Sequence, residues 1–458
     1  MEQCYSGWIN AREQFPKHEC DCIKKIYSMS YAPIGSELII TKNSLSNEQR
    51  TPFSKPVSKP SRRSVSKNKN PDRRNGIHSN YPIIVHCHLC WDWVWQRPQQ
   101  FLSRLSARHK ILFVETIGPD PQLSSPAARF WNPSGFPNVT ILRLQFPCWR
   151  WPDGAFVDGE RRRLVKEFLS GPGAAQFENA VQWFYDPMTI PAFLGQMDEI
   201  ATVYDCMDEL SKFSEAPPQI KMRERRLLAD ADVVFTGGRK LWESKKSLNS
   251  NCHFYGCGVD IDHFGKARAP ETKIPDDIAL LKKPVLGYFG VIDERMDYEL
   301  LTALAKANPN WSIAMVGPTL KVHHFPHLPN LHWFGKRDYA DLPAYCKAFD
   351  VCLMPFALNE ATEFINPTKA LEYMATGRPI ISSAVADVVT NFGSVVKIGR
   401  SHEEFISLCR DAIERPDATA IAAGLKKAAD NSWDSIVAQL ENHVAAALRQ
   451  KQVAAALA

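Results

Sequence analysis

After residue 80 the chain alternates between two hydrophobic patterns. Short β-branched and aromatic runs, typical of buried strands, are separated by segments whose apolar positions have helical spacing, such as Pro98–Ser106 and Ile220–Ala229. Apolar strands between helices indicate a parallel sheet that is covered on both faces. In the first half of the chain the predicted strands are Pro82–Cys87, Ile111–Glu115, Val139–Leu144, Val181–Tyr185, Ala201–Tyr204, Val233–Thr236 and Cys252–Tyr255.

The alternation stops at residues 266–275, which are rich in Pro, Ala and charge, and then starts again. Two successive doubly wound domains are the simplest architecture for this pattern, and ligands in such sheets bind beyond the carboxyl ends of the strands. The cleft between the domains is therefore the expected site. The second set of predicted strands is Val285–Phe289, Ser312–Val316, Leu331–Phe334, Val351–Pro355, Pro379–Ser383 and Val395–Ile398, with helices at Tyr298–Ala307, Leu342–Ala348 and Thr368–Ala375.

We therefore expect an α/β fold with two doubly wound Rossmann-like domains, residues 81–270 and 271–430, that face each other across a cleft. Beyond them, Trp433, Val437, Leu440 and Val444 have helical spacing. This pattern predicts an amphipathic C-terminal helix over residues 431–458 that packs back on the body of the protein.

Residues 1–80 have a different composition. They hold 14 Lys and Arg against 7 Asp and Glu, although the whole 458-residue chain has a net charge of only +5. Residues 51–75 are mostly Ser, Pro, Lys, Arg and Asn, which predicts a disordered basic leader. Two interpretations of this leader stay open. It either attaches the protein to an anionic membrane surface, or it is a solvated extension, which includes the case of a start assigned upstream of the true one.

The charge balance and the apolar runs exclude several classes of protein. The near-neutral body does not favour a nucleic-acid partner, which requires a basic face. No apolar run reaches the roughly 20 residues of a membrane span, and the N-terminus lacks a secretory signal, so a cytoplasmic location is expected, free or peripheral at the inner face of the membrane. The twelve cysteines are scattered, and the pair Cys87 and Cys90 has no second pair at ligand spacing, so no metal site is expected.

The segment Glu363–Ile381 holds the strongest candidate site. Asn366, Pro367 and Thr368 open a helix, with Asn366 as the expected cap, and the free amides at a helix N-terminus bind anions. Lys369 adds a positive charge for a phosphate, and Glu372, one turn further, suits the diol of a ribose. The simpler interpretation is that Lys369 and Glu372 are solvated charges on the first turn of the helix.

A second candidate segment is Gly287–Asp297. The strand ends at Gly290, which lets a ligand approach the backbone closely. Arg295 follows in the loop, and arginine suits phosphate contact.

Together these stretches resemble a known family. The chain is similar to GT-B glycosyltransferases, close to the group 1/group 4 bacterial enzymes that build surface polysaccharide, over roughly Tyr81–Ala445. The stretches that carry the resemblance, in chain order, are Trp91–Glu115, Val203–Phe213, Ala229–Gly238, Gly256–Phe264, Gly287–Asp297, Leu328–Phe356 and Asn366–Ile381.

The resemblance implies a nucleotide-sugar donor, UDP- or GDP-linked, in the second domain and a glycan or lipid-linked acceptor against the first. Glu372 would hold the ribose, and Lys369, Arg295 and the amides around Asn366 and Thr368 would hold the diphosphate. It implies a retaining reaction that needs no metal or other cofactor. The family's usual acid eight positions before Glu372 is Phe364 here, and the donor-sugar contact is therefore assigned to the neighbouring Glu363.

Two questions stay open from the sequence. A retaining enzyme needs no dedicated base, whereas an inverting one requires a carboxylate or histidine in the first domain; Asp208 is the first choice, and its plainer role is a loop or helix cap. The tryptophans Trp91, Trp93 and Trp95 are either sugar-stacking or packing residues. The alternatives to a glycosyltransferase are a sugar-nucleotide epimerase or phosphorylase of the same fold and a non-catalytic nucleotide-sugar-binding homologue.

Overall fold

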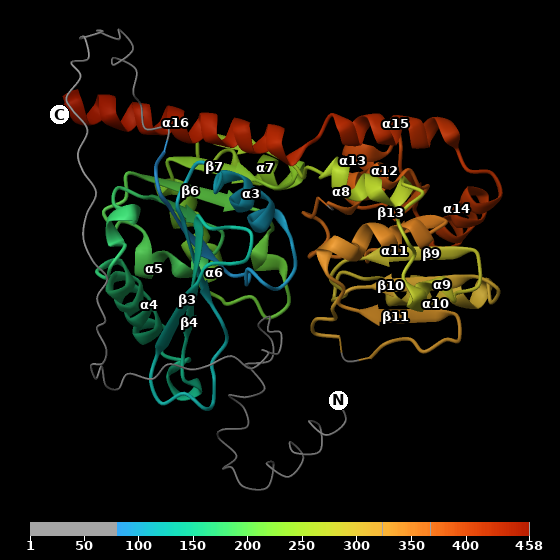
Figure 1. The fold of residues 1–458 in the computed structure, drawn as a ribbon, viewed down its shortest axis with the longest axis horizontal. Coiled ribbons are helices and arrows are strands. Elements are labelled where there is room, and N and C mark those ends of the chain that lie inside the picture. The colour runs from blue at the N-terminus through green and yellow to red at the C-terminus, as the bar shows by residue number, and fades with distance from the viewer. Residues whose placement is uncertain (1–79, 323, 367, 458) are drawn as a thin grey trace, which may run out of the picture.

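The computed structural model describes residues 80–322, 324–366 and 368–457, which form two α/β domains side by side (Figure 1). The leader expected over residues 1–80 lies, apart from Asn80, outside the described residues. Both domains have the parallel sheets and flanking helices that the hydrophobic pattern predicts, so the expected fold class is confirmed.

The first domain is built on an eight-stranded sheet in the order β3-β4-β2-β1-β5-β6-β7-β8. Neighbouring strands are parallel except for β3 and β4, which form an antiparallel edge. The strands are β1 (Ile83–Cys87), β2 (Ile111–Thr116), β3 (Ala127–Trp131), β4 (Val139–Gln145), β5 (Val181–Phe184), β6 (Ala201–Cys206), β7 (Val233–Thr236) and β8 (Cys252–Phe254). The helices are α3 (Arg97–Leu105), α4 (Gly154–Leu169), α5 (Ile190–Phe193), α6 (Ile220–Asp230) and α7 (Arg239–Lys245).

The second domain has a six-stranded, all-parallel sheet in the order β11-β10-β9-β12-β13-β14. Its strands are β9 (Val285–Phe289), β10 (Ser312–Val316), β11 (Leu331–Gly335), β12 (Val351–Met354), β13 (Ile380–Ser383) and β14 (Lys397–Gly399). Its helices are α8 (Ile261–Gly265), α9 (Asp276–Ala279), α10 (Tyr298–Ala307), α11 (Leu342–Ala348), α12 (Lys369–Thr376), α13 (Ala386–Phe392), α14 (His402–Glu414) and α15 (Ala418–Ala429).

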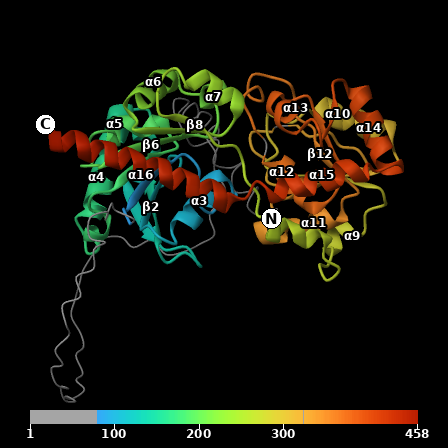
Figure 2. The same ribbon diagram turned by 90° about the horizontal axis from the view of Figure 1, so that it is seen from above.

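The long C-terminal helix α16 (Trp433–Leu457) belongs to the core of the first domain, although it follows the second in sequence (Figures 1 and 2). Its buried Trp433, Val437, Leu440 and Val444 pack with α3 on one face of the first sheet. Helices α4 and α6 cover the opposite face. The chain therefore crosses between the domains twice.

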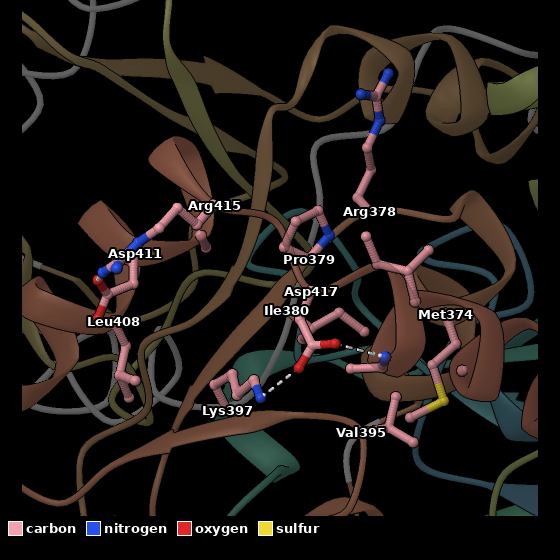
Figure 3. Close-up of a pocket in the computed structure, with 14 residues that line it drawn as sticks. Met374, Arg378, Pro379, Ile380, Val395, Lys397, Leu408, Asp411, Arg415 and Asp417 are labelled. Carbon is pink, nitrogen blue, oxygen red and sulfur yellow. Dashed lines mark hydrogen bonds and ion pairs between the residues drawn. The ribbon is translucent and has the colours of Figure 1, made fainter.

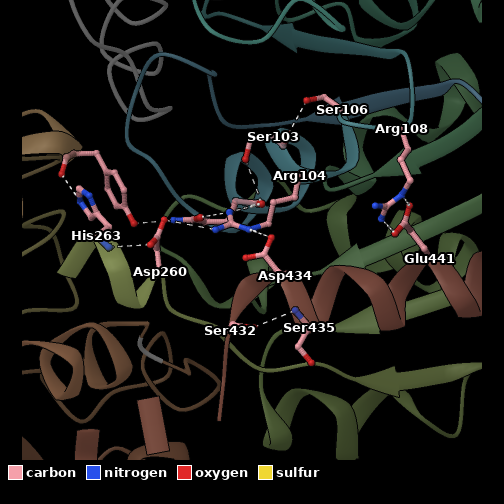
Figure 4. A network of polar contacts seen from close by, with 12 residues as sticks. Ser103, Arg104, Ser106, Arg108, Asp260, His263, Ser432, Asp434, Ser435 and Glu441 are labelled. Carbon is pink, nitrogen blue, oxygen red and sulfur yellow. Dashed lines mark hydrogen bonds and ion pairs between the residues drawn. The ribbon is translucent and has the colours of Figure 1, made fainter. Parts of the chain in front are cut away.

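The two crossings run side by side and are held by a polar network on α3 (Figure 4). The backbone N–H of Val259, in the first crossing, donates to the carbonyl of Asn431 in the second at 2.9 Å. The guanidinium of Arg104 lies 3.7 Å from the carboxylate of Asp260 and 3.1 Å from that of Asp434. One arginine of the first domain thus contacts both crossings.

Candidate functional site

The cleft is built around Gly290, which follows β9 with a φ of +145°. A Cβ at this position would lie 2.6 Å from the hydroxyl of Tyr288 and 2.9 Å from Cε of Lys369. Glycine is favoured here because L side chains rarely adopt this φ. The sequence-predicted Gly290 and Lys369 are therefore in contact.

Lys369 and Glu372 form an ion pair on the first turn of α12, with 3.4 Å between Nζ and Oε2. The geometry is not that of a hydrogen bond, and this Oε2 is buried without a hydrogen-bond partner. Burial raises the pKa of Glu372, and the ammonium of Lys369 only partly opposes that shift. Buried carboxylate oxygens usually have partners, so this one suits a donor that comes with a ligand.

Arg295 lines the same cavity, and its guanidinium is held by Asp293. Nε donates to Oδ1 of Asp293 at 2.9 Å and Nη2 donates to Oδ2 at 2.7 Å. Burial alone would lower the pKa of Arg295. The carboxylate of Asp293 has the larger, opposite effect, so the pKa of the arginine is raised. The cation is therefore permanently charged and held in position by Asp293, a partner that the sequence analysis did not identify.

Asn366 and Thr368 also line the cavity, but Asn366 does not cap α12 as expected. The N-cap of α12 is Thr368, which makes no capping hydrogen bond with its side chain. The amide of Asn366 instead donates to the carbonyl of Gly237 in the first domain at 3.1 Å. Asn366 was misassigned because its partner lies in the other domain.

Asp208, after β6, lines this cavity from the first domain. Burial raises the pKa of its carboxyl, and the charge of Arg295 acts on it across the cleft and lowers it. Two further first-domain carboxylates follow or end strands near the cleft. Asp186 caps a turn by accepting the N–H of Met188 at 2.8 Å, and Asp205 forms a buried ion pair with Arg97.

Glu363 does not line this cavity. Its carboxylate is exposed and forms an ion pair with Lys240 on α7 of the first domain. The side chain contacts the first domain and does not line the cleft, so the donor-sugar contact expected of Glu363 stays a prediction. The remaining seven candidate residues all line one cavity.

The cleft has two lobes that share Val94, Trp95, Gly290, Lys369 and Glu372. The first, of about 120 Å³, holds Arg295, Asp208 and Asn366. The second, of about 220 Å³, runs between residues 91–95 of the first domain and Gly317, Lys336 and Tyr339 of the second. Each lobe alone is smaller than the roughly 300 Å³ of a typical ligand pocket. The cleft therefore suits a ligand that spans both lobes, with its middle at Lys369 and Glu372.

Two residues of the cleft region were not found from the sequence. Arg97 lines the first lobe, donates from Nε to Asp205 at 2.9 Å, and donates from Nη1 to the carbonyl of Tyr255 at 2.7 Å. Asp387 of α13 crosses the domain boundary and accepts the backbone N–H of Arg239, at the start of α7, at 2.7 Å. Their partners lie 108 and 148 residues away in the chain, and no local pattern signals such pairs.

A separate cavity of about 310 Å³ is lined by residues of α12, β13, α14 and α15 (Figure 3), and neither Lys369 nor Glu372 lines it. Met374, Ile380 and Leu408 line it together with Lys397 and Asp417, which form an ion pair of 2.8 Å. Across the described ranges, no group of three or more His, Cys, Asp or Glu side chains is placed to hold a metal ion. Nor does the described part of the chain contain a helix that is long and apolar enough to cross a membrane.

Comparisons with known proteins place this geometry in context. Residues 283–429 match the sequence model of the family described as glycosyl transferases group 1. The chain is 26% identical over 258 residues to TuaH of Bacillus subtilis strain 168, which is named for a glycosyltransferase role in teichuronic acid biosynthesis. That match covers 50% of this chain and 62% of TuaH, which is less than two thirds of the relative.

Solved structures share the arrangement of both domains. A trehalose-6-phosphate structure from E. coli bound with UDP-2-fluoro glucose has a TM-score of 0.59 and 13% identity, covering 80% of this chain and 99% of its own. Sucrose-phosphate synthase from Thermosynechococcus elongatus has a TM-score of 0.60 and 16% identity, covering 82% and 100%. At these identities the likeness shows a shared fold.

Proposed function

We propose that this protein, a GT-B-fold chain whose second domain belongs to the group 1 glycosyltransferases, transfers a sugar from a nucleotide-sugar donor to a glycan or lipid-linked acceptor. The observation that carries the proposal is the convergence of Gly290, Arg295, Lys369 and Glu372 on one cleft between the domains. Two of these side chains are cations, and one is a buried carboxylate with an unpartnered oxygen. A ribose diphosphate offers the diol and the negative charge that such a set recognises.

In the proposed reaction, the bond between the anomeric carbon of the donor sugar and the diphosphate oxygen breaks. A bond forms between the same carbon and the acceptor hydroxyl oxygen. Lys369, Arg295 and the amides at the start of α12 would hold the diphosphate as its charge grows, and such fixed charges usually contribute most to catalysis. No metal or other cofactor has a role in this proposal.

The acceptor proton leaves by one of two routes. In a retaining reaction, which we propose, the departing phosphate oxygen takes the proton. In an inverting reaction a first-domain carboxylate takes it, and Asp208 is placed for that role because it lines the same lobe as Arg295. The likeness to TuaH supports an acceptor that belongs to polysaccharide or glycoconjugate synthesis.

The test is a transfer assay with a panel of UDP- and GDP-sugars and sugar acceptors, with and without EDTA. The proposal expects a glycosylated product from one donor, unaffected by EDTA and lost in Glu372→Ala and Lys369→Ala. Nuclear magnetic resonance of the product gives its anomeric configuration. Asp208→Asn is expected to abolish transfer only if that configuration is inverted relative to the donor. Epimerised or phosphorolysed donor without acceptor product would favour an epimerase or phosphorylase. Nucleotide binding without turnover would indicate a non-catalytic homologue.

A further inference from the structure

The first domain contains a buried lysine that the proposed reaction does not use. Lys245 ends α7 and is only 6% exposed. Its Nζ lies 2.8 Å from Oε2 of Glu224 on α6 and 2.6 Å from Oε2 of Glu209, which follows β6. Lysine is almost never this deeply buried unless it is paired. The two carboxylates provide that pairing, and one ammonium thereby joins three elements of the first domain.

The polar network around this lysine continues to the end of β6. Oε1 of Glu224 accepts hydrogen bonds from the hydroxyl of Tyr204 at 2.9 Å and from Sγ of Cys206 at 3.5 Å. Both donors are only 1% exposed. Glu224 therefore binds the strand through one carboxylate oxygen and the lysine through the other, which ties the end of β6 to the last turn of α7.

The network lies on both sides of a short segment that lines the cleft. Met207 and Asp208, which form this segment, line the first lobe. Cys206 precedes them and Glu209 follows them, and both neighbours belong to the buried network. Neither neighbour lines either lobe, so the segment is held from behind, by groups that do not line the cleft.

The turn that leads into α7 contacts the same segment. The backbone N–H of Gly237, two residues before α7, donates to the carbonyl of Cys206 at 2.9 Å. A Cβ at Gly237 would lie 2.7 Å from the carbonyl oxygen of Met207, so the two backbones are in close contact. The segment is therefore held at two points, by the turn before α7 and by Lys245 at the end of this helix.

We propose that Lys245 is a positioning residue that, through Glu209, holds Met207 and Asp208 in place on the acceptor side of the cleft. This inference rests on the proposed function, with the acceptor on the first-domain side. Lys245 lines neither lobe, and the segment that it holds belongs to the first domain. Its loss should therefore impair use of the acceptor and leave the binding of the nucleotide in the second domain intact.

The test compares Glu209→Ala with the wild type in the full-length chain. This variant removes the anchor of the segment but leaves Lys245 paired with Glu224, so the buried ammonium keeps a partner. In the transfer assay, kcat/KM for the acceptor should fall by up to about 100-fold, which is the cost of misplacing a group by about 1 Å. The affinity for UDP or GDP, measured by titration calorimetry, should stay unchanged.

A second measurement needs no substrate. Hydrogen exchange followed by mass spectrometry should be faster in Glu209→Ala for peptides that cover residues 206–213, and unchanged for peptides from the sheet of the second domain. Lys245→Met should give the same local change, and Lys245→Arg, which keeps the charge, should restore most of the protection. Lys246→Met is the matched control, because this neighbouring lysine is exposed and its Nζ lies 4.3 Å from the ring centroid of Trp242.

Three results would overturn this inference and leave the proposed function standing. They are wild-type exchange over residues 206–213 in Glu209→Ala, an unchanged kcat/KM for the acceptor in that variant, and equal losses of acceptor turnover and nucleotide affinity. A wild type that transfers no sugar would overturn the proposed function and, with it, the role of Lys245 in placing an acceptor.

Discussion

Lys369 and Glu372 lie one turn apart on α12, and the Nζ of the lysine is 3.4 Å from a carboxylate oxygen that accepts no hydrogen bond. In the proposed site the two groups serve different parts of the donor, the lysine its phosphates and the glutamate its ribose. The pair therefore predicts two distinguishable losses of affinity.

Lys369→Ala should weaken binding of a nucleoside diphosphate about 10- to 150-fold, the usual worth of a hydrogen bond to a charged group, and leave the weak binding of the bare nucleoside unchanged. Glu372→Gln should weaken both ligands. Titration calorimetry measures the two affinities, and Lys306→Ala, an exposed lysine on α10, is the control. Equal losses for both ligands in Lys369→Ala would contradict the assignment of the lysine to the phosphates.

Glu372 also predicts a pH-dependent cost in stability. Burial raises its pKa in the folded state, so the folded protein holds this proton more tightly than the unfolded chain. The contribution of Glu372 to the free energy of unfolding therefore falls as the pH rises above the ordinary pKa of glutamate, about 4.3. Glu372→Gln should unfold at a higher temperature than the wild type at pH 8, and the two should converge at pH 4. A variant that is less stable at pH 8 would show that the ion pair with Lys369 outweighs burial.

Asp387 predicts a coupling between the domains, because it caps α7 from the neighbouring domain. Asp387→Ala should lower the free energy of unfolding by about 0.5–2 kcal/mol, the usual effect of losing a helix cap. It should also raise the radius of gyration in solution scattering, because it removes a contact between the domains. Asp417→Ala is the control, because Asp417 caps α15 within the second domain. An unchanged radius in Asp387→Ala would mean that the other contacts hold the domains together.

The ion pair of Arg97 with Asp205 predicts a strong energetic coupling, since the two side chains are only 4% and 0% exposed. Arg97→Met should lower the free energy of unfolding by about 3–5 kcal/mol, because it leaves the buried carboxylate of Asp205 without its charged partner. Adding Asp205→Leu should recover part of that loss. Urea unfolding of the single and double variants measures the coupling. The same double-variant measurement on the exposed pair of Arg163 with Glu160 should give a coupling energy below about 1 kcal/mol.

The sequence predicted most elements that carry a strong hydrophobic period. Strands β7, β9 and β10 and helices α10 and α11 have the predicted bounds, because each is an unbroken apolar run or a clear helical stripe. The edge strand β3 and helix α4 were missed. β3 alternates between half-buried and exposed positions, and α4 carries charged residues around much of its surface, so neither shows the buried pattern that was sought.

The candidate site was predictable where its signal is local. Gly290, Lys369 and Glu372 follow from a strand end and a helix start, and the structure brings them together. The sequence could not show that Asn366 and Glu363 face the first domain, because both interactions depend on how the domains close.

The most direct test of the donor site is the unfolding midpoint of the full-length chain with and without UDP or GDP. A nucleotide that binds the folded state at a hundred times its Kd adds about 2.7 kcal/mol of stability. One of the two nucleotides should therefore raise the midpoint by several degrees, and Lys369→Ala should lose most of that rise. If neither nucleotide moves the midpoint of the wild type at millimolar concentration, the cleft does not hold a nucleotide-sugar donor.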